Sequence, residues 1–304
     1  MPESDYFKPL QNKSAIEEFI RNSLVLPKSD SHKGQNGKLL LIGGSELFHG
    51  ASKWSLDIAS KFVDMVFYSS VPENNELIQQ AKKSFWNGIV IPRTEIVNYI
   101  EEADCILIGP GMTRVPPETE IWHSDPASWL EEILSEDDWN HSTQKIVNYL
   151  LALYPEKKWV IDAGALQMCD PRLLTERCIL TPHAGELERL LERQESIDQL
   201  LETGCLVVLK GEEDRIFNKH HTQIVTGGNP GLTKGGTGDV LAGLLAALAC
   251  TNEQWVASIA ASLTNKLAGE NLAKEVGPFF NASDLVDAIP RTLWEMLEGT
   301  SGVQ

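Results

Sequence analysis

Asp239 is the acidic side chain whose surroundings most favour chemistry. It follows Thr226–Gly238, a stretch with six glycines and one proline, and it precedes the small, apolar run Val240–Cys250. A glycine turn that leads into a helix presents unpaired backbone N–H groups and the positive end of the helix dipole, which together suit phosphate. A carboxylate there is better suited to act as a base beside a phosphoryl-transfer site. From this loop alone, a structural role as the helix cap stays equally open.

Several other side chains that could do chemistry follow short apolar runs. Asp162 could hold Mg²⁺ through water or brace a loop, and Glu186 could order a Mg²⁺-bound water or stabilise a first helical turn. His183 could donate to a substrate oxygen or phosphate, or cap the helix that follows it. Lys210 could reach a phosphate or pair with an acid, and Lys234 could bind phosphate or be solvated. The histidines show no spacing typical of a transition-metal site.

Short runs rich in Val, Ile and Leu must position these groups. Seven of them predict buried strands: Lys38–Ile42, Met65–Ser69, Gly88–Ile91, Cys105–Ile108, Trp159–Ile161, Cys178–Leu180 and Leu206–Leu209. Helical segments separate most of these runs, and Asp214–Phe217 with Gln223–Val225 predicts a hairpin at the sheet edge. Continuous apolar strands that alternate with helices are typical of an α/β fold with a mostly parallel sheet covered on both faces.

The strand ends predict where a ligand binds, because ligands of open parallel sheets lie beyond the carboxyl ends of the strands. Six such ends carry glycines, small residues or chemically active residues, and the loop before Asp239 is one of them. The chain has no GxxxxGK[ST] loop, no GxGxxG after the first strand and no GxSxG elbow. What remains is phosphoryl transfer in which a glycine turn supplies the anion hole and Asp239 takes a hydroxyl proton.

The composition argues against two classes of binding partner. The 304 residues carry 43 acidic and 26 basic side chains, a formal charge of −17, which argues against nucleic acid and anionic membranes as partners. No stretch is long and apolar enough to span a membrane, and the N-terminus lacks the apolar core of a signal peptide. The five cysteines are scattered and flank apolar runs, which predicts reduced core residues and a cytoplasmic location.

The predicted organisation is a lead-in segment, 1–30, followed by one catalytic domain, 31–304. The lead-in holds a helix over Ser14–Leu24, for which Ser14 and Glu17 predict a capping box. Residues 114–141 read as an insertion that packs onto the body or onto another subunit, since they hold Trp122, Trp129 and Trp139.

The motifs also resemble a known family. KGGTGDVLAG (Lys234–Gly243) resembles the GxGD motif of ribokinase-like kinases. Further runs occur in the order seen in ADP- or ATP-dependent NAD(P)H-hydrate dehydratases: HKGQNGKLLLIGGS, HGAS, IGPGMTR, VIDAGAL, TPHAGELERLL, VVLKGEED and GNPGLTKGGTGD. The resemblance covers about residues 30 to 290, and the TPHxGE run with GNPG…GxGDVLAG is its most specific part.

This resemblance implies a ribokinase-like three-layer α/β/α fold and a repair reaction. An adenine nucleotide, ADP or ATP, phosphorylates the ring hydroxyl of hydrated NADH or NADPH (NADHX, NADPHX), and elimination of phosphate restores the dihydronicotinamide. Mg²⁺ would bridge the phosphates, and a homo-oligomer, a dimer or tetramer, is implied. Carried over by position, Asp239 would be the base and Gly236–Gly238 would stabilise the transferring group. The implied ligand contacts are Ala51, Gly111, His183 and Asp239 for the hydrated cofactor, and Lys210, Gly211, Glu212, Glu213, Asp214 and Gly238 for the nucleotide.

Three positions depart from the family pattern. Ser52 stands where the family usually has proline, Thr113 where it commonly has glycine, and Gly164 where it usually has a second aspartate. Two other functions stay open: a ribokinase-like kinase for a thiazole or another vitamin, which would release a phosphorylated product, and a nucleotide-binding regulatory or scaffold protein without catalysis. TPHAGE with the His49–Ser52 loop favours the dehydratase over the kinase, and an intact Asp239 argues against the scaffold.

Overall fold

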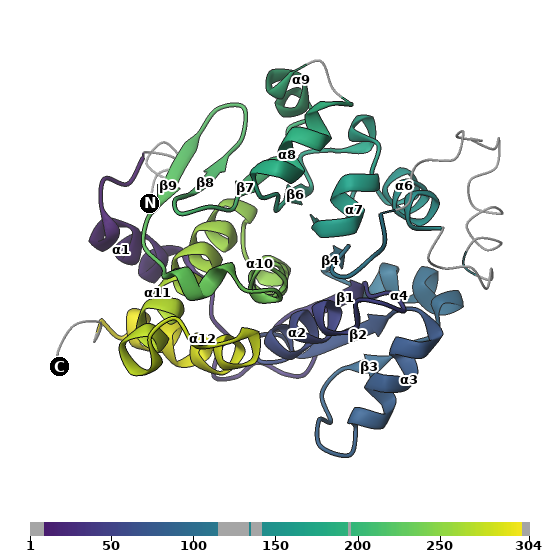
Figure 1. Cartoon of the computed structure of the whole chain (residues 1–304), viewed down its shortest axis with the longest axis horizontal. Coiled ribbons are helices and arrows are strands. Elements are labelled where there is room, and N and C mark those ends of the chain that lie inside the picture. The colour runs from purple at the N-terminus through teal and green to yellow at the C-terminus, as the bar shows by residue number, and fades with distance from the viewer. Residues whose placement is uncertain (1–8, 115–133, 135–141, 194–195, 300–304) are drawn as a thin grey trace.

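One sheet organises the molecule. The computed structural model describes residues 9–114, 134, 142–193 and 196–299, and nine strands in this part of the chain lie in the order β3-β2-β1-β4-β5-β6-β7-β8-β9 (Figure 1). Their bounds are β1 (Lys38–Ile42), β2 (Met65–Ser69), β3 (Ile89–Val90), β4 (Cys105–Ile108), β5 (Trp159–Ile161), β6 (Cys178–Leu180), β7 (Leu206–Leu209), β8 (Asp214–Phe217) and β9 (Thr222–Val225). Strands β1 to β7 pair in parallel, whereas β8 and β9 form an antiparallel hairpin at one edge.

Helices cover both faces of the sheet. They are α1 (Lys13–Ser23), α2 (His49–Ala59), α3 (Pro72–Ala81), α4 (Ile96–Glu102), α6 (Thr143–Leu153), α7 (Ala163–Met168), α8 (Ala184–Leu191), α9 (Ile197–Glu202), α10 (Thr237–Thr251), α11 (Gln254–Val276) and α12 (Ala282–Leu297). Leu39 and Leu41 of β1 pack into a core with α1, α2, α10, α11 and α12. Leu40 and Ile42 point the other way, into a core with α4, α6, α7, α8 and α9. This alternation along one strand makes the protein a three-layer α/β/α fold (Figure 1).

The predicted strands are confirmed, with one shortened. β3 is only two residues long, because Gly88 has φ 76° and Ile91 precedes Pro92, whose ring disfavours a continued strand. The central helix α10 has no hydrophilic face, and Val240–Cys250 is buried throughout, so it fills the space between the sheet and α11. The predicted capping box at Ser14 is wrong. Asn12, two residues before Ser14, is the N-cap of α1: its backbone is extended, and its side chain accepts from the Ala15 N–H at 3.0 Å.

The N-terminal segment packs against the core and against the edge strand of the sheet. Ile16, Phe19 and Ile20 of α1 are buried in the core. The backbone of Leu10 exchanges hydrogen bonds with the side chain of Gln223 on β9.

All five cysteines are buried free thiols, as predicted. None of the helices in the described part of the chain is both long and apolar enough to cross a membrane. The three tryptophans of the predicted insertion, Trp122, Trp129 and Trp139, lie outside the described residues.

Candidate active site

Asp239 lies on the first turn of α10, at the end of the glycine-rich loop. The N-cap of this helix is Gly236, whose φ of 95° is left-handed, and no side chain caps the helix. Asp239 is therefore not the N-cap, and its carboxylate makes no capping hydrogen bond to the helix. An added Cβ at Gly236 would come within 2.4 Å of the Trp54 ring, so both the backbone angle and the packing require glycine there.

The first turn of α10 leaves a backbone donor beside Asp239. The Thr237 N–H donates to the Lys234 carbonyl at 3.3 Å, and the Val240 N–H donates to the Gly236 carbonyl at 3.0 Å. The Gly238 N–H makes no hydrogen bond to another residue that the structure describes. A free donor at the positive end of a fifteen-residue helix is suited to an anion.

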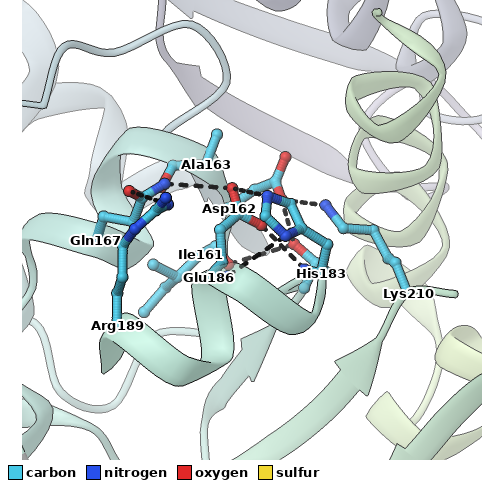
Figure 2. Close-up of polar contacts among 9 residues, drawn as sticks. Ile161, Asp162, Ala163, Gln167, His183, Glu186, Arg189 and Lys210 are labelled. Atoms are coloured by element: carbon cyan, nitrogen blue, oxygen red, sulfur yellow. Dashed lines mark hydrogen bonds and ion pairs between the residues drawn. The ribbon is translucent and has the colours of Figure 1, made fainter. Parts of the chain in front are cut away.

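Lys210 and Asp162 form an ion pair next to this helix end. The Lys210 Nζ lies 2.9 Å from the Asp162 Oδ1 (Figure 2). The same oxygen also accepts from the Thr181 hydroxyl at 2.7 Å. Asp162 is buried, whereas the Lys210 side chain keeps 18% of its surface exposed. The sequence did not decide whether Lys210 binds a phosphate or pairs with an acidic side chain. The structure gives it an acid partner at the end of β5, with exposed surface that still allows a ligand contact.

Charge and burial act together on Asp239. Burial, followed by the negative charge of Asp162, raises the pKa of Asp239 to about 7, although Lys210 acts in the opposite direction. The pKa of Lys210 is also raised: burial would lower it, but the negative charges of Asp162 and Glu186 outweigh that effect. A carboxyl group with a pKa near 7 can exchange a proton at neutral pH, as a general base must.

His183 and Glu186 stabilise the start of α8. The His183 Nδ1 accepts from the Glu186 N–H at 3.3 Å, and the Glu186 Oε2 accepts from the His183 N–H at 3.0 Å, which is a capping box. The structural roles that the sequence left open are therefore present: His183 caps α8, and Glu186 stabilises its first turn. The His183 side chain nevertheless remains half exposed and lines a cavity, so capping does not prevent it from binding a ligand.

Ala51 and Gly111 meet where the strand order of the sheet reverses. This switch point lies between β1 and β4, and an added Cβ at Gly111 would lie 3.1 Å from the Ala51 Cβ. The hydroxyl of buried Ser55 donates to the Asp239 carbonyl at 2.8 Å and lies 3.3 Å from the Ala51 carbonyl. Ser55, which sequence reasoning missed, therefore ties the Ala51 turn of α2 to the turn that holds Asp239.

The structure explains two of the departures from the family pattern. An added Cβ at Gly164 would lie 2.2 Å from the Met112 carbonyl, so the loop after β4 packs where a side chain at position 164 would begin. A second acid cannot be accommodated there without a shift of that loop. At Ser52, the buried hydroxyl lies 2.8 Å from the buried Tyr68 hydroxyl, a partner that proline would lack.

A cavity of about 900 Å³ opens beside Lys210 and Gly238. It is lined by the 211–214 loop, the glycine-rich loop and one face of α11. All the residues implied for nucleotide binding line it: Lys210, Gly211, Glu212, Glu213, Asp214 and Gly238. Glu212 and Glu213 are exposed at its edge, whereas Asp214 is buried and accepts from the Gly211 N–H at 3.0 Å. Asp214 thus braces the loop.

Lys266 of α11 is a residue of this cavity that sequence reasoning missed. Its Nζ lies 3.2 Å from the Asp214 Oδ1 and donates to the Gly211 and Glu212 carbonyls, each at 3.0 Å. It also donates to the Gly227 carbonyl at 3.4 Å, so it joins two loops that are distant in sequence. The signal was present, because Lys266 is the only charged residue in the otherwise uncharged run 254–269.

Lys234 does not point to a phosphate in this structure. Its Nζ donates to the Pro278 carbonyl at 2.6 Å and to the Phe280 carbonyl at 2.5 Å. It therefore fastens the glycine-rich loop to the turn between α11 and α12. Within the described ranges, no three His, Cys, Asp or Glu side chains form a group that could hold a metal ion.

Comparisons with known proteins place the chain in a family. The family model described as NAD(P)H-hydrate dehydratase matches residues 39–291. The chain is 37% identical to the bifunctional NAD(P)H-hydrate repair enzyme Nnr of Methanocaldococcus jannaschii, over 87% of this chain and 50% of that protein. It is 30% identical to the ADP-dependent (S)-NAD(P)H-hydrate dehydratase of Cenarchaeum symbiosum, over 91% of this chain and 95% of that protein. The chain spans about half the length of the first two curated relatives.

Solved structures agree on the fold. A ribokinase-like superfamily protein from Enterococcus faecalis aligns with a TM-score of 0.73 at 25% identity, over 94% of this chain and 95% of that one. The Bacillus subtilis ADP/ATP-dependent NAD(P)H-hydrate dehydratase, co-crystallised with ATP and Mg²⁺, has a TM-score of 0.69 at 23% identity, over 92% of this chain and 97% of that one. The fold is ribokinase-like, and the chain belongs to the NAD(P)H-hydrate dehydratase family.

Proposed function

We propose that the protein converts the hydrated cofactors NADHX and NADPHX back to NADH and NADPH, with ADP or ATP as the phosphoryl donor. The observation that carries this proposal is the carboxyl group of Asp239, whose pKa is about 7, on the first turn of α10 beside the free N–H of Gly238. A base and an anion-binding donor then lie next to each other at the edge of a cavity large enough for a nucleotide.

In the proposed reaction, Asp239 takes the proton of the ring hydroxyl as the hydroxyl oxygen attacks the terminal phosphorus of the nucleotide. The bond from that phosphorus to its bridging oxygen breaks, so AMP leaves when the donor is ADP and ADP leaves when the donor is ATP. The Gly238 N–H, with the start of α10, stabilises the charge on the transferring phosphoryl group. Departure of phosphate from the ring carbon, with loss of a proton from the adjacent carbon, restores the double bond of the dihydronicotinamide. Gly236 keeps the turn in the conformation that presents this donor.

The remaining contacts are also proposals. Ala51, Gly111 and His183 would contact the hydrated nicotinamide, since the first two meet at the switch point and His183 borders the cavity. Lys210 and Gly211–Asp214 would line the nucleotide. Lys210 would contact its phosphates, because part of its surface is exposed and it adjoins Gly238: an added Cβ there would lie 3.6 Å from the Lys210 Nζ.

Mg²⁺ would enter with the nucleotide. Both oxygens of Glu186 already accept hydrogen bonds, from the Gln167 amide and the His183 N–H, whereas Asp162 accepts its hydrogen bonds from Thr181 and Lys210 on Oδ1 alone. This donor set fits an ion held mainly by phosphates and water, as is common for Mg²⁺, with Asp162 as the carboxylate that has an oxygen still available. When bound, the ion would neutralise phosphate charge during transfer.

We also propose a cytoplasmic homo-oligomer. Five buried free cysteines support a reducing compartment, and Trp86, Phe279 and Leu47 expose most of their apolar surface, as residues of subunit interfaces do in isolated chains. Light scattering coupled to gel filtration measures the assembly, and a monomeric mass at micromolar concentration would contradict that part of the proposal.

The experiment that tests the function is direct. The protein is incubated with hydrated NADPH and either ADP or ATP, and the absorbance of the dihydronicotinamide is followed while released phosphate is measured. We expect absorbance and phosphate to rise together with one of the two nucleotides and not without nucleotide. No recovery of absorbance from hydrated NADPH, together with phosphorylation of a thiazole or another vitamin alcohol, would favour the kinase alternative instead.

A further inference from the structure

A turn of two glycines forms part of the cavity wall, and α11 holds it from behind. Gly227 and Gly228 both line the cavity, and both have positive φ, 112° and 97°. The Gly228 N–H donates to the Glu270 Oε1 at 3.0 Å. The Gly227 carbonyl accepts from the Lys266 Nζ at 3.4 Å. Positions 266 and 270 are about one helical turn apart, so one face of α11 fixes both glycines.

The carboxylate of Glu270 lies directly against this turn. An added Cβ at Gly227 would come within 2.5 Å of the Glu270 Oε1. Adjacent glycines form a very flexible backbone, which loses more conformational entropy than any other when it is held in one shape. The hydrogen bond from Gly228 offsets part of that cost before a ligand arrives. Because it acts through the backbone of the turn, Glu270 can influence a ligand that it does not touch.

The lead-in segment supports the turn from two sides. The Lys13 Nζ, on the first turn of α1, lies 3.3 Å from the second carboxylate oxygen of Glu270, Oε2. Leu10 exchanges hydrogen bonds with the side chain of Gln223 on β9, the strand that leads into the turn. In the fold, α1 lies beside both α11 and β9 (Figure 1). These contacts come from residues that precede the 39–291 region matched by the family model.

The two contacts of Glu270 differ in strength. The hydrogen bond from the Gly228 N–H has a charged acceptor, which makes it one of the stronger kinds. The ion pair with Lys13 is partly exposed, with 46% of the lysine side chain and 29% of the glutamate side chain accessible, so solvent weakens it. We therefore expect the hydrogen bond to hold the turn and the ion pair to orient the carboxylate that accepts it.

We propose that Glu270 is a positioning residue for the nucleotide and that the lead-in segment, through Lys13, completes its support. The carboxylate holds the Gly227–Gly228 turn in the shape that the nucleotide meets, so binding does not have to order the turn. This inference rests on the proposed function, which places the nucleotide in this cavity. It gives residues outside the matched family region a part in nucleotide binding.

The test measures ADP affinity by calorimetry for the wild type, Glu270→Ala, Glu270→Gln, Lys13→Met and the control Lys61→Met. Lys61 forms a comparable exposed ion pair with Asp287. We expect Glu270→Ala to weaken ADP binding about 10-fold, because the turn loses a hydrogen bond to a charged acceptor. Glu270→Gln keeps an acceptor and lacks only the ion pair, so it should lose about 2- to 5-fold, as should Lys13→Met. Lys61→Met should bind ADP like the wild type.

Kinetics distinguish positioning of the nucleotide from general loosening of the protein. In Glu270→Ala, the KM for the nucleotide should rise, whereas kcat at saturation and the KM for hydrated NADPH should stay near the wild-type values. The double variant Lys13→Met/Glu270→Gln should lose no more ADP affinity than either single variant, because both changes remove the same ion pair.

Unchanged ADP affinity in Glu270→Ala, or an equal rise of both KM values, would overturn the inference and leave the proposed function intact. If the alanine variant does not fold, equal ADP affinity of the wild type, Glu270→Gln and Lys13→Met would overturn it in the same way. Failure of the wild type to bind ADP at millimolar concentration would instead contradict the proposed function itself.

Discussion

The cavity is lined by two lysines that the fold uses differently. Lys266, with Asp214 and the carbonyls of Gly211, Glu212 and Gly227, forms a cluster in which the lysine side chain is 4% exposed and its ammonium group joins two loops. We call this the Lys266 cluster. Lys210 is more exposed and shares its surroundings with three acids, Asp162, Glu186 and Asp239. Asp162, Lys210 and Asp239 are the Lys210 cluster.

The difference is one of charge balance. In the Lys266 cluster, one buried carboxylate and three carbonyl oxygens surround one cation, so charge and hydrogen-bonding capacity are matched. In the Lys210 cluster, negative charge exceeds positive charge, and burial together with this excess raises the pKa of Asp239. We expect the matched cluster to hold the fold together, because removal of its cation would leave a buried carboxylate unpaired. In the cluster with excess negative charge, one carboxyl group has a raised pKa and can exchange a proton near neutral pH. The predictions below test this division.

The largest expected effect follows removal of the base. Asp239→Asn keeps the shape of the side chain and removes its ability to take a proton, so turnover should fall by about 10²–10⁴. Stability should not fall, because the change removes one charge from a cluster with excess negative charge. Turnover and urea unfolding of this variant are compared with Asp287→Asn, at an exposed aspartate of α12. A rate near that of the wild type would remove Asp239 from the mechanism.

The next effect is on stability. Lys266→Met leaves the Asp214 carboxylate buried without its cation, so the free energy of unfolding should fall by about 3–5 kcal/mol. Lys274→Met, at an exposed lysine on the same helix, is the matched control and should change stability little. Chemical denaturation measures both. Equal stability of the two variants would mean that the Lys266 cluster does not hold the loops together.

The sequence predicted the sheet better than it predicted the contacts within these clusters. The bounds of β1, β2 and β4 follow from apolar runs flanked by polar residues or glycines, a local pattern that tertiary packing did not override. The position of Asp239 on the first turn of α10 follows from the sequence, because the glycine turn and the helix start are adjacent in it. The partners of Lys266 and Lys234 could not be predicted in the same way, because their acceptors lie 39 to 55 residues away.

A smaller effect separates two glycines of one turn. Gly236→Ala forces a side chain into a φ of 95° and against Trp54, and should cost about 1–3 kcal/mol of stability. At Gly238 an added Cβ meets only the Lys210 Nζ, at 3.6 Å, so Gly238→Ala should fold normally and instead weaken nucleotide binding or turnover. Thermal unfolding and ADP titration of the two variants distinguish these outcomes. Loss of stability in both variants, with no specific loss of binding, would make the whole turn structural.

The finest test concerns the pH dependence that links Lys210 and Asp239 within the Lys210 cluster. Because the base must be ionised, kcat/KM should be low under acidic conditions and rise with an apparent pKa of about 7. The positive charge of Lys210 lowers the pKa of Asp239, so Lys210→Met should move that rise to higher pH, by about one unit. The profile of Lys266→Met, measured on its folded fraction, should keep the wild-type midpoint. If the two lysine variants shift the midpoint equally, the raised pKa of Asp239 comes from the cavity as a whole, and the distinction between a matched cluster and one with excess charge fails.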